Sequence, residues 1–169
     1  AVAPRKVAIL GSGPAELSFA HFITRFGHSA TIFEPDASLG GKLRSGPQAR
    51  LLPEVMLDAE VQRLQTAGIL IRHERTTLDD LAADYGAVFG TFQDPGQLSL
   101  VILEDLQQDS IPAGEEASEN VNLRVSDAIG YGKWTAILLD ATWRGLDPQE
   151  VYARTQVGGN PRILSAIKY

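Results

Sequence analysis

The order of apolar and polar positions divides the first third of the chain into alternating strand-like and helix-like segments. The apolar run Lys6–Leu10 ends at a glycine-rich turn, and apolar residues then return at helical spacing as far as Gly27. A second apolar run, Ala30–Phe33, is followed directly by the acid Glu34. This pattern predicts a strand, a turn, a helix and a second strand that ends in a carboxylate.

The rest of the chain continues the alternation. The helix after Pro53 carries an apolar stripe, Val55, Leu57, Val61 and Leu64, which we interpret as core packing. The further predicted elements are a long loop at Pro35–Gly46, a helix from Pro53 to Gly68, strands at Ile69–Ile71 and Tyr85–Phe89, a short helix at Thr77–Asp80, a strand or short helix at Leu98–Leu103, an exposed loop at Gln107–Asn122, a helix from Ser126 or Asp127 to Gly145, and a short helix at Asp147–Arg154. Alternating strands and helices indicate an α/β fold, a parallel sheet with helices on both faces. At 169 residues we expect one domain.

The first of these segments has the features of a dinucleotide-binding loop. Gly11 permits the tight turn, and Gly13 lacks a Cβ, so that a pyrophosphate can approach the backbone at the start of a helix. Glu34 stands where an acid can accept hydrogen bonds from a ribose diol. The predicted cofactor-binding residues of this unit are Gly11, Ser12, Gly13, Pro14, Ala15 and Glu34. We therefore predict a Rossmann-like fold.

One position departs from this fingerprint. The third glycine, which normally lets the helix pack closely on the strand, is replaced by Glu16. A glutamate at this position must point outward, displace the helix, or lie near the phosphates and repel them. The residue pattern leaves these three outcomes open.

Composition excludes several kinds of partner and chemistry. The net charge is −6 and Lys and Arg do not cluster, so we expect neither nucleic acid nor an anionic membrane as partner. We also expect no membrane span, no signal peptide and a cytoplasmic location. The absence of cysteine excludes disulfides and Cys-ligated iron–sulfur clusters in this chain. The histidines have no partner at metal-ligand spacing.

Four segments, in order, resemble the FAD domain of the glutamate synthase small-subunit family, which includes the N-terminal flavin part of dihydropyrimidine dehydrogenase. They are VAILGSGPAE with FEP, LGGKLRSGPQARLLPEVMLDAEVQRLQTAGI, YGAVFGTF and SDAIGYGKWTAILLDATWRGLD. The resemblance implies FAD as cofactor and adds the contact residues Gly41, Lys42, Leu43, Arg44, Gly90, Ala128 and Ile129. The residue types alone allow two interpretations of Lys42 and Arg44: they lie near the phosphates or the flavin, or they are exposed charges of the loop.

The departures from this family concern the cofactor site. Only Asp94–Asn122 separates the third segment from the fourth, where the family has its NAD(P)H unit, so the fold is expected to be a truncated version. The Gly-Asp element before the closing helix has no counterpart. We favour an FAD-binding electron-transfer subunit of a larger oxidoreductase complex, without an NAD(P)H site of its own. The alternative is a non-catalytic structural subunit that keeps the fold but has lost the flavin. Both predict other subunits of a redox complex as partners; a stand-alone reductase is least favoured.

Overall fold

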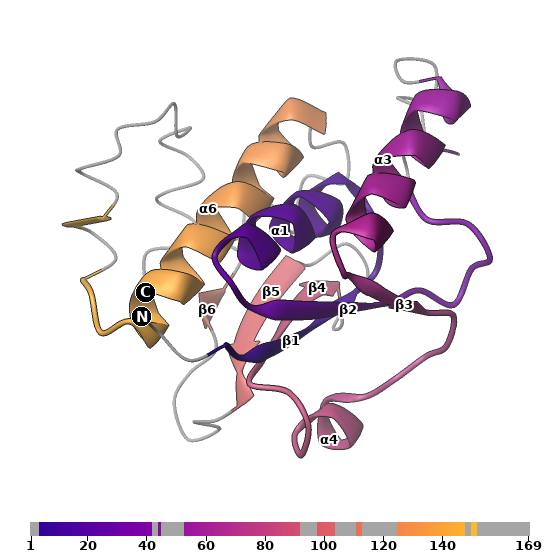
Figure 1. Cartoon of the computed structure of the whole chain (residues 1–169). Helices are drawn as coiled ribbons and strands as arrows, with labels where there is room; N and C mark the ends of the chain where they lie inside the picture. Colours follow the sequence, from indigo (N-terminus) through magenta and orange to yellow (C-terminus); the bar gives the residue numbers. More distant parts are fainter. Residues whose placement is uncertain are drawn as a thin grey trace.

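A six-stranded sheet with the strand order β3-β2-β1-β4-β5-β6 organises the described residues (Figure 1). The computed structural model describes residues 4–41, 44, 53–91, 98–103, 111–112, 125–147 and 150–151. The elements in chain order are β1 (Lys6–Leu10), α1 (Pro14–Arg25), β2 (Ser29–Phe33), α3 (Glu54–Thr66), β3 (Leu70–Arg72), α4 (Leu78–Leu81), β4 (Ala87–Thr91), β5 (Leu98–Ile102), β6 (Ile111–Pro112) and α6 (Val125–Trp143). The predicted α/β fold is confirmed.

The sheet is parallel over four strands and antiparallel at one edge. β1 pairs in parallel with both β2 and β4, and β2 pairs in parallel with β3, as predicted. β5 runs antiparallel to β4, and β6 runs antiparallel to β5. A parallel crossover needs about a dozen residues or more, and the chain between Thr91 and Leu98 is shorter than that. This short connection explains why β5 turns back along β4. Within the predicted loop 107–122 the structure describes one short strand, β6, and the other residues of the loop lie outside the described ranges.

The two faces of the sheet are covered unequally. α1, α3 and α6 lie on one face and the short α4 on the other, which confirms helices on both sides (Figure 1). Because side chains alternate along a strand, β1 sends Val7 and Ile9 into the larger core and Ala8 and Leu10 into the smaller one. The larger core makes the α1 face the main source of hydrophobic stabilisation.

Two helices, far apart in sequence, cross very closely on that face. A Cβ on Gly132 of α6 would overlap the carbonyl oxygen of Ala15 in α1. The Ser18 hydroxyl donates a 2.6 Å hydrogen bond to the carbonyl oxygen of Ile129. Beneath them, Phe19 of α1 stacks on Phe89 of β4, with ring centroids 4.4 Å apart. The start of α6 is thereby fixed against the first half of α1.

The predicted short helix at Asp147–Arg154 lies mostly outside the described residues, and the other remaining elements are largely confirmed. Thr77 caps α4, its hydroxyl accepting a hydrogen bond from the Asp80 N–H at 3.2 Å. The run at 98–103 is a strand rather than a helix. The apolar stripe of α3 is wrong at Val55, which is 79% exposed, although Leu57 and Leu64 are buried as predicted. Val55 lies two residues before Leu57 and therefore on the opposite side of the helix from the residues that pack on the core.

Candidate dinucleotide site

The turn between β1 and α1 has the backbone of a dinucleotide-binding loop. Gly11 has a φ of +101°, a conformation that favours glycine, and its N–H donates a 3.0 Å hydrogen bond to the carbonyl oxygen of Phe33 at the end of β2. Gly13 is the N-cap of α1 and Pro14 occupies the first turn. Because Gly13 has no side chain, the N-cap residue accepts no side-chain hydrogen bond from the first N–H groups of α1, which face the loop.

The side chain of Glu16 lies against this loop. Glu16 is only 7% exposed. A Cβ built on Gly11 would lie 2.6 Å from Glu16 Oε2, and one built on Gly13 would lie 3.2 Å from Glu16 Oε1. Helical side chains tilt toward the helix N-terminus, which directs this glutamate back toward the loop. Of the three outcomes left open by the sequence, the carboxylate takes the place beside the predicted phosphate position.

The acid at the end of β2 is present as predicted, and protein groups already hold it. Glu34 is buried, and its Oε1 accepts a 2.5 Å hydrogen bond from the Ser12 hydroxyl. Its Oε2 accepts a hydrogen bond from the Asp36 N–H at 3.2 Å. The Ser12 hydroxyl in turn accepts a 3.0 Å hydrogen bond from the Gly40 N–H. Both carboxylate oxygens of Glu34 thus have partners within the chain.

The segment after β2 lies directly on the loop. A Cβ on Gly41, whose φ is +51°, would lie 3.5 Å from the Cα of Gly13. Together with the Gly40–Ser12 hydrogen bond, this contact holds residues 36–41 against the β1–α1 turn. The structure therefore brings Gly41 to the predicted loop.

Arg44 is held by α3. Its guanidinium pairs with Asp58 at 2.6 Å and with Glu54 at 3.2 Å, and its Nε donates to the carbonyl oxygen of Leu39. Both acids belong to α3, so Arg44 ties the segment after β2 to that helix. Lys42 and Leu43 lie outside the described residues.

The three remaining predicted contact residues lie beside the central strand and the crossing helices. Gly90 pairs with Leu10 in the sheet, and a Cβ there would overlap the Leu10 carbonyl. On α6, Ala128 is buried and Ile129 is 44% exposed, next to Ser18 of α1. Tyr131 is buried near Phe89, and burial raises the pKa of its phenol, which stays protonated at neutral pH.

A buried polar cluster, which the sequence did not reveal, joins α6 to the opposite end of the sheet. His28 Nδ1 accepts a 3.2 Å hydrogen bond from the Arg5 N–H, so that Nε2 carries the proton that faces Asp140 Oδ1 at 2.8 Å. The other carboxylate oxygen of Asp140 accepts from Arg144 Nε at 2.7 Å. The one signal of this cluster in the sequence is the spacing of Asp140 and Arg144, which are four residues apart on a predicted helix and can therefore pair. The cluster links α6 to the residues that directly precede β1 and β2.

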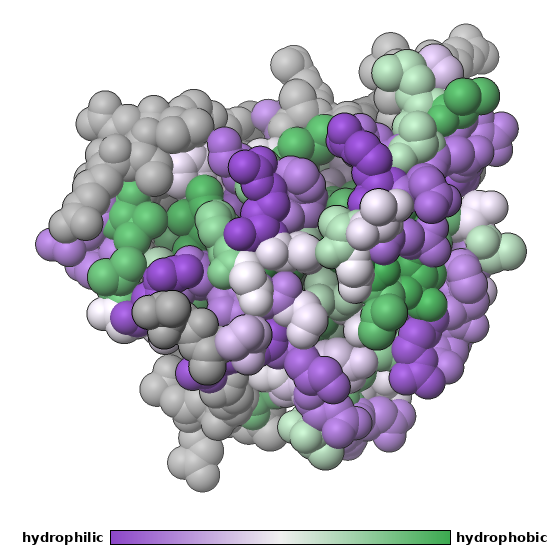
Figure 2. Space-filling view, in the orientation of Figure 1, coloured by the Kyte–Doolittle hydropathy of each residue, from purple (hydrophilic) through white to green (hydrophobic). Residues whose placement is uncertain are grey.

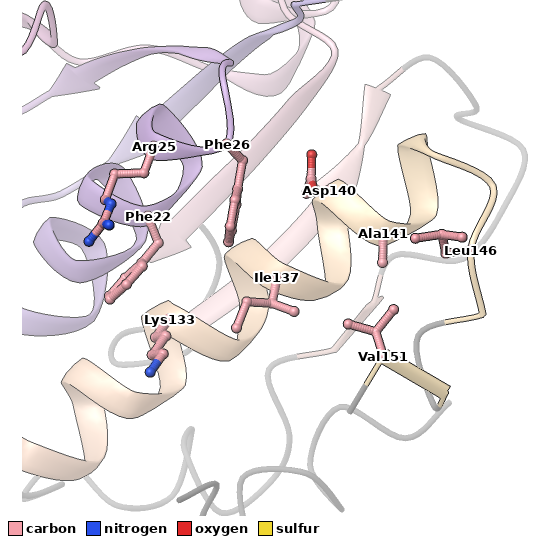
Figure 3. Close-up of a pocket in the computed structure, with 9 residues that line it drawn as sticks. All are labelled: Phe22, Arg25, Phe26, Lys133, Ile137, Asp140, Ala141, Leu146 and Val151. Carbon is pink, nitrogen blue, oxygen red and sulfur yellow. The ribbon is translucent and has the colours of Figure 1, made fainter. Parts of the chain in front are cut away.

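A shallow apolar groove runs between the later turns of α1 and α6 (Figure 3). It encloses about 470 Å³. The residues that line it are Phe22, Arg25, Phe26, Lys133, Ile137, Asp140, Ala141, Leu146 and Val151. None of them is a predicted cofactor contact. Within the described ranges, no group of histidines and acids is arranged to hold a metal ion.

Comparison with known proteins agrees with the predicted family. Residues 9–81 match the NAD(P)-binding Rossmann-like domain family. The chain is 33% identical over 156 residues to the NAD-dependent dihydropyrimidine dehydrogenase subunit PreT of Escherichia coli K12, covering 86% of this chain and 38% of that protein. It is 40% identical over 100 residues to the glutamate synthase [NADPH] small chain of the same strain, covering 53% and 21%.

A third relative is the NADP(+)-dependent formate dehydrogenase subunit beta of Moorella thermoacetica, 38% identical over 90 residues and covering 50% of this chain and 13% of that protein. The chain thus spans less than two fifths of the length of these three relatives. The described helices include none with the length and apolar character of a membrane span. The resemblance to the glutamate synthase small-subunit and dihydropyrimidine dehydrogenase type of protein is confirmed.

The fit of a dinucleotide to this loop fails at one side chain. Gly11, Gly13 and Gly41 lie together at the loop between β1 and α1, and the acid Glu34 is buried beside it. The carboxylate of Glu16 lies in the space that the missing Cβ atoms leave open. In this conformation a pyrophosphate would meet a buried group of its own charge.

Proposed function

We propose that the chain is a subunit or domain of a larger oxidoreductase complex and that it keeps the FAD-domain fold without holding the pyrophosphate of FAD at its loop. The observation that carries this proposal is the buried carboxylate of Glu16 beside Gly11 and Gly13. Two unit charges about 4 Å apart interact by about 4 kcal/mol at an effective dielectric constant of about 20. A repulsion of that size weakens binding about a thousandfold.

The proposed role is structural. Three relatives are named as subunits or chains of dehydrogenases or a synthase, which makes other subunits of a redox complex the expected partners here. The fold keeps a well-packed core, in which α1, α6 and the sheet are closely joined. Such a core can present fixed surfaces to partner subunits without a cofactor of its own. A cytoplasmic location is part of this proposal.

A second candidate is an FAD-binding electron-transfer subunit that has no NAD(P)H site of its own. The place of the acid Glu34 directly after β2 favours it, because a carboxylate there can accept hydrogen bonds from a ribose diol once Ser12 gives up its own bond to it. In that case Glu16 would turn away from the loop, and FAD, once bound, would pass electrons to and from a partner. The predicted contacts at Gly41, Lys42, Leu43, Arg44, Gly90, Ala128 and Ile129 belong to this candidate.

One measurement separates the two candidates. The protein is purified with its natural partners, its visible absorption spectrum is recorded, and any flavin is released with acid and assigned to a chain. We expect an intact complex in which this chain carries no flavin. Stoichiometric FAD on this chain would establish the electron-transfer candidate instead.

A further inference from the structure

We propose that Glu16 is a built-in anion: its carboxylate takes the place of a dinucleotide's pyrophosphate on the Gly11–Gly13 loop, and this one side chain decides that the loop does not bind diphosphates. The inference rests on the proposed function, since it gives the reason why the loop is without a cofactor. The class of ligand that Glu16 excludes is a nucleoside diphosphate or a dinucleotide.

The position of the carboxylate supports this role. One oxygen of Glu16 lies within 2.6 Å of the Cβ position at Gly11 and the other within 3.2 Å of that at Gly13. These are the two open spaces through which a phosphate approaches the loop backbone. The side chain is almost wholly buried, so its carboxyl group is part of the folded site and is not a solvated surface group.

The electrostatics of the helix end favour the same arrangement. The first N–H groups of α1 and the positive end of its dipole attract an anion, whether it comes from a ligand or from the chain. The N-cap, Gly13, has no side chain that could satisfy these groups. Glu16 in the first turn, three positions after the N-cap, has the geometry by which a glutamate reaches back to the helix start.

The segment after β2 lies against the same loop. Gly41 lies on Gly13, and the Gly40 N–H is bonded to Ser12. The Ser12 hydroxyl also donates a hydrogen bond to one carboxylate oxygen of Glu34, the group that is predicted to bind a ribose. Protein groups therefore stand in for both the phosphate and the ribose contacts.

The test compares ADP and FAD binding by the full chain and three variants, using calorimetry and fluorescence. Glu16→Gly restores the fingerprint glycine and opens the space, and we expect it to bind ADP at least about tenfold more tightly than the unaltered chain. Glu16→Gln keeps the shape but removes the charge, and we expect a smaller gain. Glu60→Gly is the matched control, because it places a glycine in the exposed face of α3 and leaves the loop intact. It should bind ADP as the unaltered chain does.

Each outcome decides the question. If the unaltered chain binds FAD stoichiometrically, both the inference and the proposed function are overturned. If it binds none and a folded Glu16→Gly binds ADP no better, the inference is overturned and the proposed function stands. Should Glu16→Gly fail to fold, Glu16→Gln decides, since tighter ADP binding supports the inference and unchanged binding refutes it.

Discussion

Ser12 is the residue on which the closed form of the loop depends. Its hydroxyl donates to the buried Glu34 carboxylate and accepts from the Gly40 N–H. We predict that Ser12→Ala lowers the free energy of unfolding by about 1–3 kcal/mol, because it leaves a buried carboxylate oxygen and a buried N–H without these partners. Urea unfolding measures this loss. Ser38→Ala, at an exposed position, is the control and should stay within about 0.5 kcal/mol. Equal losses of unfolding free energy in Ser12→Ala and Ser38→Ala would show that the hydrogen bonds of Ser12 do not stabilise the fold.

His21 gives the stability of the chain a pH dependence of known sign. Burial lowers its pKa from 6.5, and the neighbouring Arg25 and Arg63 lower it further. The unfolded chain therefore takes up this proton at a higher pH than the folded chain does, so stability falls as the pH drops through the unfolded pKa. We predict that the melting temperature of the unaltered chain, relative to that of His21→Gln, falls between about pH 8 and about pH 5. A difference that does not change with pH would refute this.

At the scale of elements, the crossing of α1 and α6 depends on Gly132. An alanine within a helix is normally about 1 kcal/mol more favourable than glycine. Here the added Cβ would overlap the carbonyl oxygen of Ala15, and overpacking of this kind costs about 1–3 kcal/mol or more. We therefore predict that Gly132→Ala destabilises the protein, measured as a lower midpoint of urea unfolding.

The control for this prediction is Gly68→Ala. Gly68 has a φ of +103° and open space around its Cβ position, so that variant measures backbone strain without a clash. Stabilisation by Gly132→Ala would mean that the two helices do not approach this closely.

The elements that sequence predicted best are those whose signals are local. β1, α1 and β2 follow from apolar periodicity and the glycine turn, and α4 follows from Thr77 and the acids after it. The sequence left 98–103 open as a strand or a short helix, and it placed β6 within an exposed loop, because the two residues of β6 are too short a run to show a periodic pattern. Val55 was misplaced because residues two apart on a helix lie about 200° apart, so Val55 faces away from the side that buries Leu57.

The candidate site was predictable as a list of backbone positions but not as an arrangement of side chains. Gly11, Gly13 and Glu34 stand where the fingerprint places them. The direction of the Glu16 side chain depends on its rotamer, which the sequence pattern does not specify. The partners of Arg44 come from α3, and His28 meets Asp140, which is 112 residues away in sequence. Long-range contacts such as these leave no periodic trace.

At the scale of the whole molecule, the described part of the surface does not indicate which partner binds. The large exposed apolar side chains among the described residues are Val55, Met56, Leu70, Ile129 and Leu146. Figure 2 shows hydrophobic residues on this face in several small groups set among polar ones, one of them over the outer end of α3. Separate apolar residues are normal on protein surfaces and do not mark an interface. The search for partners therefore depends on co-purification.

The arrangement of the sheet predicts where the folded chain opens first. β1 lies between β2 and β4, and Val7, Ala8 and Ile9 are fully buried, so its amides exchange only when the whole domain unfolds. β3 lies at the sheet edge, is three residues long and leaves Leu70 64% exposed. We predict that hydrogen exchange measured by mass spectrometry is much slower in peptides covering β1 than in those covering β3. Equal rates would mean that the domain opens as one unit, so that the edge strand would be as stable as the centre that holds the Gly11–Gly13 loop.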